Sequence, residues 1–386
     1  MKIGLFTDAF FPMTDGVGMV VHNYAKYLMN YGEVIVFCPK YHLSFDDSKL
    51  PYKVVRCASF KVLGIDYSLP IPDVDLSFIK ELDKYKLDIV HIHSPFTMGK
   101  VGVRYAKKHH IPVIGSMHSQ YKQDFMRATK NKYLASKLTN TILRVYAKCN
   151  ECWAVSSEVA RIYHEDYGFK YLPKVMNNAT EMLPVENISK ARKYINKECD
   201  INDNTLMFLF VGRINNLKNV FFILDVIKRI KELYDLKFKM VYVGEGQDME
   251  ELKKRIKKYK LGKDVLLYGK VDDREELSNF YQRADLFIFP SMYDASSIVQ
   301  IEAASQKTPC IFAKDSATSS MVKNNINGFV EEIDVDKFAN RIIKIMNNKE
   351  LLEKVSNRAY KDLYVTWKQK INDVYKKYEE IIKKGL

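Results

Sequence analysis

Two cations follow a glycine in the segment Gly212-Arg213-Ile-Asn-Asn-Leu-Lys218, directly after an apolar run. Arginine offers a planar fork of N–H donors and lysine a mobile point charge, so the two together suit a diphosphate. The sequence after Lys218 favours a helix, whose first turn would add backbone N–H groups for an anion. The spacing therefore predicts a diphosphate site, and the alternative is a loop with solvated charges.

Two carboxylates stand eight positions apart in Asp294-Ala-Ser-Ser-Ile-Val-Gln-Ile-Glu302. Glu302 lies between Ile301 and Ala303, and a carboxylate in apolar helical surroundings is costly unless it is paired or functional. Asp294 falls at or before the start of the helix, where an acid is a common N-cap. The pair predicts a polar ligand site, and a simple helix cap is the alternative for Asp294.

The first half of the chain has weaker candidates. Gly16 and Gly18 precede a helical stretch and could present backbone N–H groups to an anion, although a structural turn fits them equally well. His91, His93 and His118 fall at the ends of two apolar runs, where a single histidine is more often structural. A metal site needs three or four ligands, and no carboxylate or thiol stands out beside the imidazoles. We therefore expect no metal here.

Short apolar runs alternate with amphipathic stretches along nearly the whole chain. The runs form two series: Ile3–Thr7, Val34–Cys38, Ile89–His93, Val113–Met117 and Trp153–Ser156, then Leu206–Val211, Lys239–Val243, Val265–Tyr268, Leu286–Phe289 and Cys310–Ala313. Buried strands that alternate with helices predict parallel sheets covered on both faces. Ligands bind at the carboxyl ends of such strands, which is where the candidate residues fall. We predict an α/β protein with two doubly wound domains.

The predicted domain boundaries follow from changes in composition. We expect a first domain over residues 1–180, a polar linker over 181–204 and a second domain over 205–365. Residues 366–386 read as a charged helix whose apolar stripe could pack back on the first domain.

The charge distribution limits the possible partners. The chain carries a net charge of +14, and residues 101–150 hold ten Lys and Arg residues but a single acid, Asp124. Such a segment suits nucleic acid, an anionic membrane or an acidic substrate. No nucleic-acid motif is present, so we expect no nucleic-acid partner. No run of 18 apolar residues and no signal peptide is seen, so we expect a cytoplasmic protein.

Taken together, these motifs resemble family 4 of the retaining glycosyltransferases, which have the GT-B fold. The likeness covers nearly the whole chain, and its layout is most similar to bacterial lipid glycosyltransferases such as diacylglycerol glucosyltransferases. The residues that carry it are Gly212, Arg213 and Lys218 in a Gly-Arg-x4-Lys element, Asp294 and Glu302 in a Glu-x7-Glu element, and Gly16 and His118 in the first half.

The resemblance implies two facing domains, with an acceptor-side domain over 1–180, a nucleotide-sugar domain over 205–365 and the active site in the cleft between them. It implies that Arg213 and Lys218 neutralise the leaving diphosphate. It also implies a role for six further residues: Glu302 on the ribose, Asp294 and His118 on the donor sugar, and the backbone amides of Gly16, Ser297 and Ile298 on the donor. No metal or other cofactor is implied, because the nucleotide sugar is a substrate.

From the resemblance we expect a metal-independent retaining hexosyltransferase. Its donor would be UDP-glucose or a similar nucleotide sugar, and its acceptor a membrane lipid or a cell-envelope glycan. Residues 101–150 would hold it peripherally on anionic lipid at the inner face of the cell membrane. The metal-dependent Asp-x-Asp spacing occurs at Asp73–Asp75 and Asp334–Asp336, which we interpret as solvated turns.

Three departures from the family pattern support an alternative. The first acid is Asp294 instead of Glu, Ala295-Ser-Ser297 replaces the usual Gly-Phe-Gly, and Asn178-Ala179 replaces Asn-Gly. The shorter acid sets its carboxylate back by about 1.5 Å, one carbon–carbon bond. The alternative is a catalytically silent protein with this fold that stabilises another transferase.

Overall fold

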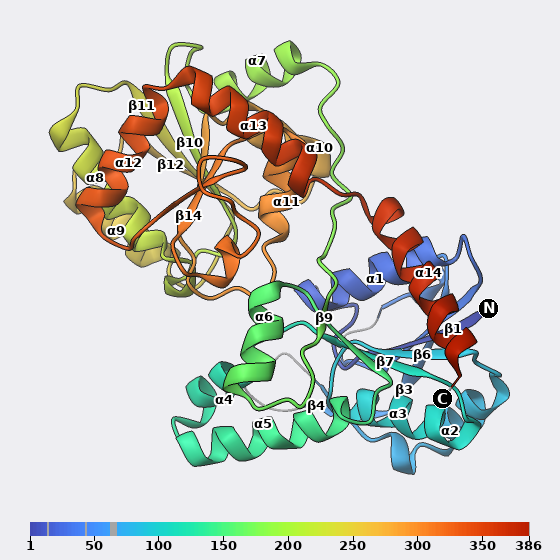
Figure 1. Cartoon of the computed structure of the whole chain (residues 1–386). Coiled ribbons are helices and arrows are strands. Elements are labelled where there is room, and N and C mark those ends of the chain that lie inside the picture. Colours follow the sequence, from blue (N-terminus) through green and yellow to red (C-terminus); the bar gives the residue numbers. More distant parts are fainter. Residues whose placement is uncertain (14, 43–44, 62–67, 386) are drawn as a thin grey trace. The chain divides into compact units, whose positions relative to one another are not determined.

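The computed structural model describes the chain except residues 14, 43–44, 62–67 and 386, and it divides into two compact units. Unit 1 comprises Met1–Asn178 together with Trp367–Leu386, and unit 2 comprises Ala179–Thr366. Each unit is built around a parallel sheet with helices packed on it (Figure 1). The segment 181–204, which we predicted as a linker, lies within unit 2.

Unit 1 contains a seven-stranded sheet in the order β3-β2-β1-β6-β7-β8-β9, with every pair parallel. The strands are β1 (Lys2–Phe6), β2 (Glu33–Pro39), β3 (Lys53–Cys57), β6 (Ile89–Ile92), β7 (Val113–Met117), β8 (Glu151–Ala154) and β9 (Lys174–Val175). The central strands are buried along almost their whole length, as expected for a sheet covered on both faces. The strand order reverses between β1 and β6.

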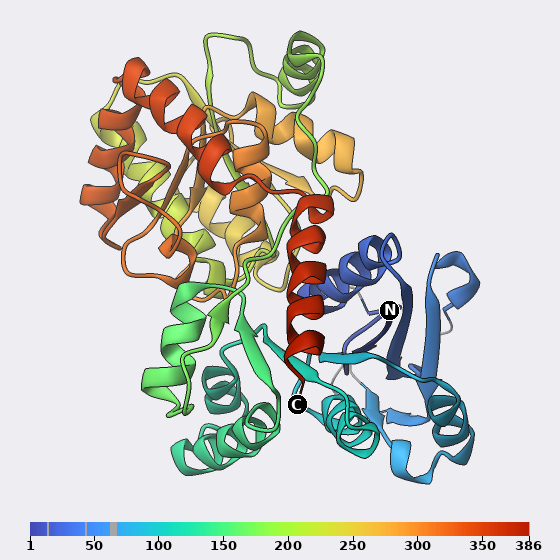
Figure 2. The ribbon, with the colours of Figure 1, turned by 45° about the vertical axis from the view of Figure 1, so that its right-hand side comes forward.

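The helices of unit 1 come from both ends of the chain. They are α1 (Gly16–Leu28), α2 (Leu76–Lys84), α3 (Thr97–His109), α4 (Tyr121–Thr129), α5 (Lys132–Tyr146), α6 (Ser157–Arg161) and α14 (Trp367–Lys384). A small antiparallel pair, β4 (Ser59–Lys61) and β5 (Ser68–Pro70), is also present. Figure 2 shows α14 alongside α1, and Tyr31 and Tyr375 stack there with ring centroids 4.5 Å apart. Helix α14 buries the apolar stripe that its sequence predicts, including Val374 and Tyr378.

Unit 2 contains a six-stranded sheet in the order β12-β11-β10-β13-β14-β15, again with every pair parallel. The strands are β10 (Leu206–Val211), β11 (Phe238–Val243), β12 (Val265–Gly269), β13 (Leu286–Phe289), β14 (Cys310–Ala313) and β15 (Phe329–Glu331). The order reverses between β10 and β13. Phe210 and Phe289 stack across this junction at 5.7 Å, so the apolar core continues beneath it.

The helices of unit 2 alternate with its strands. They are α7 (Ile188–Glu198), α8 (Val220–Leu233), α9 (Met249–Lys258), α10 (Arg274–Arg283), α11 (Ile298–Ser305), α12 (Val335–Met346) and α13 (Lys349–Leu363). Helix α7 is fixed to the rest of the unit by Arg283, whose fully buried guanidinium donates to Asn196 at 2.6 Å and to the carbonyl of Thr205 at 2.8 Å.

The predicted α/β class with two doubly wound parallel sheets is confirmed. All ten predicted strands are present, with ends shifted by a few residues. The sequence did not predict the edge strands β3, β9 and β15. These are short or half-exposed, so their apolar pattern is weak, as is common at sheet edges. No helix in the described part of the chain is long and apolar enough to cross a membrane.

Candidate active site

Two glycines hold the loop that carries Arg213. A Cβ on Gly244 would lie 2.0 Å from the carbonyl oxygen of Gly212, and a Cβ on Gly246 would lie 2.2 Å from that of Ile214. Only glycine permits this approach, and Gly244 also has a φ of +140°. The amide of Ile214 donates to the carbonyl of Glu245 at 2.9 Å. The loop after β10 is therefore seated on the loop after β11, with Arg213 left exposed.

Lys218 and Asp294 meet where the strand order of unit 2 reverses. Lys218 follows β10 and Asp294 follows the neighbouring strand β13, and Nζ lies 2.6 Å from Oδ2. The side chains are 21% and 23% exposed, so the pair is partly desolvated but still open to solvent. The carboxyl ends at such a reversal are where doubly wound sheets bind ligands. The structure thus brings together two predicted site residues that are 76 positions apart.

Neighbouring contacts fix the position of this ion pair. Lys218 Nζ lies over the ring of Phe289, 5.4 Å from its centroid. Asn219 donates from its side-chain amide to the carbonyl of Pro290 at 2.7 Å, and its left-handed backbone turns the chain into α8. The two strand-end loops are consequently joined by a side-chain ion pair and by a hydrogen bond to the backbone.

Glu302 is buried in α11 and has two partners from α10. Its Oε1 accepts from Arg274 at 2.9 Å and its Oε2 accepts from the hydroxyl of Tyr281 at 3.2 Å. Burial raises the pKa of Glu302, while the charge of Arg274 and both hydrogen bonds act in the opposite direction. As expected from the sequence, burying the Glu302 carboxylate costs free energy unless it is paired, and the structure shows that it is paired. Arg274 and Tyr281 had no signal in the sequence, because their contact with Glu302 depends on the fold.

The first turn of α11 contains polar groups without partners. The hydroxyl of Ser297 and both amide atoms of Gln300 are buried and make no hydrogen bond with the described residues. Helix α11 begins at Ile298, so the amides of Ser297 and Ile298 lie at its N-terminus, and the Ile298 amide donates to the carbonyl of Ser296 at 3.1 Å. Buried polar groups normally find a partner, which makes this turn unusual in the molecule.

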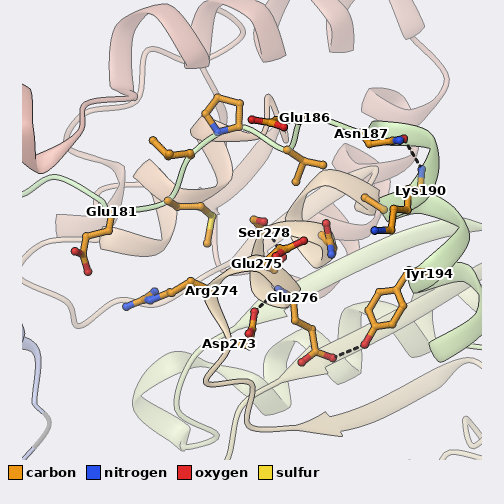
Figure 3. A pocket seen from close by; sticks show the side chains of 16 residues that line it. Glu181, Glu186, Asn187, Lys190, Tyr194, Asp273, Arg274, Glu275, Glu276 and Ser278 are labelled. Atoms are coloured by element: carbon orange, nitrogen blue, oxygen red, sulfur yellow. Dashed lines mark hydrogen bonds between the residues drawn. The ribbon is translucent and has the colours of Figure 1, made fainter.

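A pocket of about 880 Å³ lies in unit 2 beside the start of α10 (Figure 3). It is lined by the segment 181–194 and by residues 273–279, including Arg274. The carboxylate of Glu276 accepts from the hydroxyl of Tyr194 at 3.0 Å within it. Arg274, the partner of Glu302, thus also borders this pocket.

In unit 1, Gly16 is the first residue of α1. Asp15 caps this helix, since its Oδ1 accepts from the amide of Gly18 at 2.6 Å. A Cβ on Gly16 would meet nothing within 4 Å, so packing does not require glycine there. Asp8, at the end of β1, accepts from the hydroxyl of Ser94 at 2.7 Å, and burial raises its pKa to about 6.

Three histidines lie side by side at the ends of β6 and β7. His93 Nδ1 is 3.1 Å from His118 Nε2, and the rings of His91 and His93 lie 4.1 Å apart. His91 also contacts the hydroxyls of Ser116 at 2.8 Å and Tyr378 at 2.6 Å. Burial lowers the pKa of His118 to about 4 and lowers those of His91 and His93 well below the usual value. All three imidazoles are therefore neutral at pH 7.

The residues that the structure describes contain no group of three His, Cys, Asp or Glu side chains arranged to hold a metal ion. The two Asp-x-Asp segments have local roles. Asp75 caps α2 by accepting from the amide of Phe78 at 3.0 Å, and Asp334 caps α12 by accepting from that of Lys337 at 2.8 Å. Each of these carboxylates is thereby occupied at a helix start.

The predicted site residues therefore fall into two sets. Gly212, Arg213, Lys218, Asp294, Ser297, Ile298 and Glu302 belong to unit 2, and Gly16 and His118 belong to unit 1. Within unit 2, the diphosphate and acid motifs are joined directly by the Lys218–Asp294 pair. The Gly244-Glu-Gly246 segment after an apolar run is visible in the sequence as a strand-to-helix glycine turn, which on its own is a weak signal of a site, whereas Arg274 was missed.

Comparison with known proteins agrees with this arrangement. A model described as "Glycosyltransferase Family 4" matches residues 14–178, and one described as "Glycosyl transferases group 1" matches residues 192–362. Alpha-monoglucosyldiacylglycerol synthase of Acholeplasma laidlawii is 26% identical over 93% of this chain and 92% of its own length. A UDP-Gal:alpha-D-GlcNAc-diphosphoundecaprenol alpha-1,3-galactosyltransferase of Escherichia coli is 27% identical over 72% of this chain and 70% of its own.

Solved structures share the same architecture. HepE of Anabaena in complex with UDP is superimposed with a TM-score of 0.77 at 16% identity, over 98% of this chain and all of that one. Sucrose-phosphate synthase of Thermosynechococcus elongatus gives a TM-score of 0.78 at 16% identity, over the whole of both chains. The two family matches occupy most of the chain and divide it as the two units do. The chain belongs to family 4 of the glycosyltransferases and has the GT-B fold.

Proposed function

We propose that this glycosyltransferase is a retaining, metal-independent hexosyltransferase that uses a UDP-linked hexose such as UDP-glucose. Its acceptor is a membrane lipid or a cell-envelope glycan, and it works at the cytoplasmic face of the cell membrane. The relative from A. laidlawii is named for a glucosylated diacylglycerol and the one from E. coli for UDP-galactose and a lipid diphosphate. These names support the donor and acceptor classes.

The observation that carries the proposal is the Lys218–Asp294 pair beside the Arg213 loop. When a nucleoside diphosphate leaves a sugar, negative charge builds on the diphosphate. Two cations held in place before the reaction stabilise that charge without having to reorganise. Lys218 is already held by its carboxylate partner and by the ring of Phe289, so it is positioned before the donor arrives.

The other unit 2 residues complete the donor site of this proposal. The backbone amides of Ser297 and Ile298, at the start of α11, donate hydrogen bonds to the nucleotide sugar. Glu302 accepts hydrogen bonds from the ribose hydroxyls. Asp294 accepts from a hydroxyl of the donor sugar and so connects sugar recognition to the cation that stabilises the leaving group. In unit 1, Gly16 and His118 contact the donor through a backbone amide and an imidazole. The reaction needs no resident cofactor.

The test is a screen of UDP-, GDP- and ADP-hexoses with the purified full chain, in buffer with and without a chelator. Thermal stabilisation identifies the donor, since a ligand at about 100 times its Kd adds roughly 2.7 kcal/mol of stability. NMR of the anomeric proton of the product then reports whether the configuration is retained. Inversion, or loss of all activity with the chelator, would contradict the proposal.

A second candidate is a catalytically silent partner of another transferase. It rests on the replacement of the usual Gly-Phe-Gly by Ala295-Ser-Ser297, where the Ser297 hydroxyl is buried without a partner. Donor hydrolysis separates the two candidates. The purified chain hydrolyses its donor slowly if it is an enzyme, whereas a silent partner leaves every nucleotide sugar intact.

Helices α4 and α5 are the proposed membrane-binding surface. Met126, Tyr133 and Leu134 are 36%, 79% and 42% exposed, which is unusual for large apolar side chains close together in the sequence. The neighbouring Lys130 and Lys132 are also exposed and make no ion pair with the part of the chain that is described. Apolar and basic side chains side by side suit an anionic bilayer surface.

Vesicle flotation tests this surface. The variant with Lys130, Lys132 and Lys137 replaced by Ser should lose binding to vesicles that contain phosphatidylglycerol and keep donor hydrolysis. The control replaces three exposed lysines of α9, namely Lys254, Lys257 and Lys258, and should float like the wild type. Salt should weaken binding, because it screens the attraction. Equal flotation on neutral and anionic vesicles would overturn this part of the proposal.

A further inference from the structure

His118 has one ring nitrogen engaged and one available. Its Nε2 is 3.1 Å from Nδ1 of His93, and its Nδ1 makes no hydrogen bond with the described residues. The two rings are nearly parallel, with an angle of 16° between their planes. His93 is completely buried, and its other nitrogen, Nε2, has no partner among the described residues. The contact with His93 therefore decides what His118 offers to a substrate.

Both rings are neutral at pH 7, because burial lowers the pKa of each. A neutral imidazole carries one proton, which lies on either Nδ1 or Nε2. A hydrogen bond between the two histidines requires the proton to lie on one of the facing nitrogens and not on both. Two arrangements are possible. One leaves a lone pair at Nδ1 of His118, and the other places an N–H there.

In one arrangement His118 donates from Nε2. His93 then accepts at Nδ1 and must carry its own proton on Nε2, where the structure offers a buried N–H no acceptor. In the other arrangement His93 donates from Nδ1, and its unpartnered Nε2 is only a lone pair. Buried N–H groups without an acceptor are rarer in proteins than acceptors left unused. The second arrangement is therefore favoured.

We propose that His93 is a positioning residue that donates from Nδ1 to His118 and thereby fixes the tautomer of His118 with its proton on Nδ1. His118 then presents an N–H donor to an oxygen atom of the substrate, either a sugar hydroxyl or an oxygen of the departing phosphate. A donor at this place complements the negative charge that develops when the diphosphate leaves. This inference rests on the proposed function only for the identity of the substrate oxygen that accepts from His118; the tautomer of His118 does not depend on it.

His91 keeps His93 in place. Its ring lies 4.1 Å from that of His93 and is fixed at both nitrogens by Ser116 and Tyr378. Tyr24 covers His93 from another side, with its ring edge-on at 5.0 Å. His93 therefore cannot turn its Nδ1 away from His118 without disturbing two packed rings. The tautomer of His118 is consequently set by groups that never touch the substrate.

The direct test is nitrogen-15 NMR of the histidine side chains in the full chain at pH 7.5, without ligand. We expect His118 to be protonated on Nδ1 and unprotonated on Nε2, and His93 to be protonated on Nδ1. The His118→Asn variant assigns the signals, and His109→Asn is the control for the loss of an exposed histidine. A proton on Nε2 of His118 would overturn the proposal, whether or not the protein transfers sugar.

The functional test compares two substitutions of His93. Asn places an amide N–H near the position of the imidazole Nδ1, whereas Leu has no donor. We expect His93→Leu to lower kcat/KM about tenfold, the effect of one lost hydrogen bond, and His93→Asn to restore most of it. Equal losses in both variants would mean that His93 only fills space. If the wild type uses no nucleotide sugar, the proposed function fails while the NMR result still decides the tautomer.

Discussion

The two units differ in the charge of the side chains near the carboxyl ends of their sheets, although both sheets are parallel and reverse their strand order in the same way. Unit 2 has charged pairs there, Lys218 with Asp294 after two strand ends and Arg274 with Glu302 on the adjoining helices α10 and α11. In unit 1 the ends of β6 and β7 carry His91, His93 and His118, all neutral and buried. The pairs in unit 2 are partly open to solvent, whereas His91 and His93 are completely buried and His118 is 9% exposed.

A doubly wound sheet determines that ligands bind at the carboxyl ends of its strands. The side chains at those ends determine which interactions a ligand can make, and these differ between the two units. A leaving diphosphate needs cations that are already in position, and of the two cations in the proposed site Lys218 is held by the carboxylate of Asp294. A sugar hydroxyl needs a hydrogen bond of defined direction, and a neutral imidazole such as that of the proposed contact His118 offers one without carrying a charge at pH 7. Substitutions and pH should accordingly affect the two sets in different ways.

The largest expected effect comes from the cations of unit 2. Lys218→Ala and Arg213→Ala should each lower kcat by roughly 10²–10³, the range found for single preorganised electrostatic groups. Both Lys218→Ala and Lys218→Met leave Asp294 without its partner, but Met keeps most of the side-chain volume, so Lys218→Met is the better test of the charge alone. Steady-state kinetics with the best donor is the measurement.

The control for this loss is Lys228→Ala, which removes a lysine of α8 that is paired with Glu232 at 3.3 Å. It should turn over at the wild-type rate. Rates near that of the wild type for both Lys218→Met and Arg213→Ala would mean that unit 2 does not stabilise a leaving diphosphate.

The next largest effect is the acid sensitivity of unit 1. The pKa of His118 is about 4 in the folded chain and near 6.5 when unfolded, so between these values only the unfolded chain binds the proton. The free energy of unfolding must therefore fall as the pH falls through this window. Asp8 acts the opposite way, because its folded pKa is raised to about 6. On acidification the three histidines with lowered pKa values reduce the free energy of unfolding by more than the single Asp8, with its raised pKa, increases it.

Urea unfolding at pH 7.0 and pH 4.5 measures this effect in the wild type and in His118→Asn. The variant lacks one group that protonates on unfolding, so its loss of stability on acidification should be smaller by about 2 kcal/mol. An identical loss in both proteins would show that His118 is not held in its neutral form. The same comparison with Lys218→Met should show no such difference, which separates the two units.

Glu302 is expected to contribute less than the cations. Glu302→Gln keeps an acceptor for the hydroxyl of Tyr281 but removes the charge, and Arg274 is exposed enough to be solvated instead. The Kd for the donor should rise about tenfold, because hydrogen bonds to a charged group are stronger than neutral ones. Isothermal titration with UDP measures it. If Arg274→Gln raises the Kd for UDP about tenfold while Glu302→Gln leaves it unchanged, the guanidinium and not the carboxylate contacts the nucleotide.

The sequence predicted the fold better than the details of the site. Central strands are buried on both faces, so their apolar runs were visible in the sequence, whereas edge strands such as β15 were not. The Lys218 and Asp294 motifs were found because each has a characteristic spacing next to a strand end. Their direct contact followed only from the strand order, which places β10 next to β13.

Partners supplied by distant parts of the chain could not be predicted. His91 is fixed by Tyr378, which is 287 positions away, and Glu302 by Arg274 from a different helix. Neither contact has a signature in the local sequence, because a hydrogen bond between distant elements needs only two suitable side chains and the right packing. Such contacts decide protonation and orientation, so the chemistry of the site became visible only with the fold.

The smallest expected effect concerns the start of α11, where unit 2 also contains uncharged buried polar groups. Gln300 is 1% exposed and neither of its amide atoms has a partner in the described chain. Gln306, at the end of the same helix, is also buried, but it donates to the carbonyl of Leu183 at 2.7 Å and accepts from the amide of Val185 at 2.9 Å. The two glutamines therefore form a matched pair.

Replacing each by Met keeps the shape and removes the amide. Gln300→Met should raise the free energy of unfolding by about 1 kcal/mol, because an unsatisfied buried amide costs desolvation without a compensating hydrogen bond. Gln306→Met should lower it by about 1–3 kcal/mol, since it leaves the Val185 amide and the Leu183 carbonyl unpaired. Urea unfolding without ligand measures both. If Gln300→Met is destabilising as well, an ordered water satisfies this amide, and the first turn of α11 is as fully paired as the charged residues beside it.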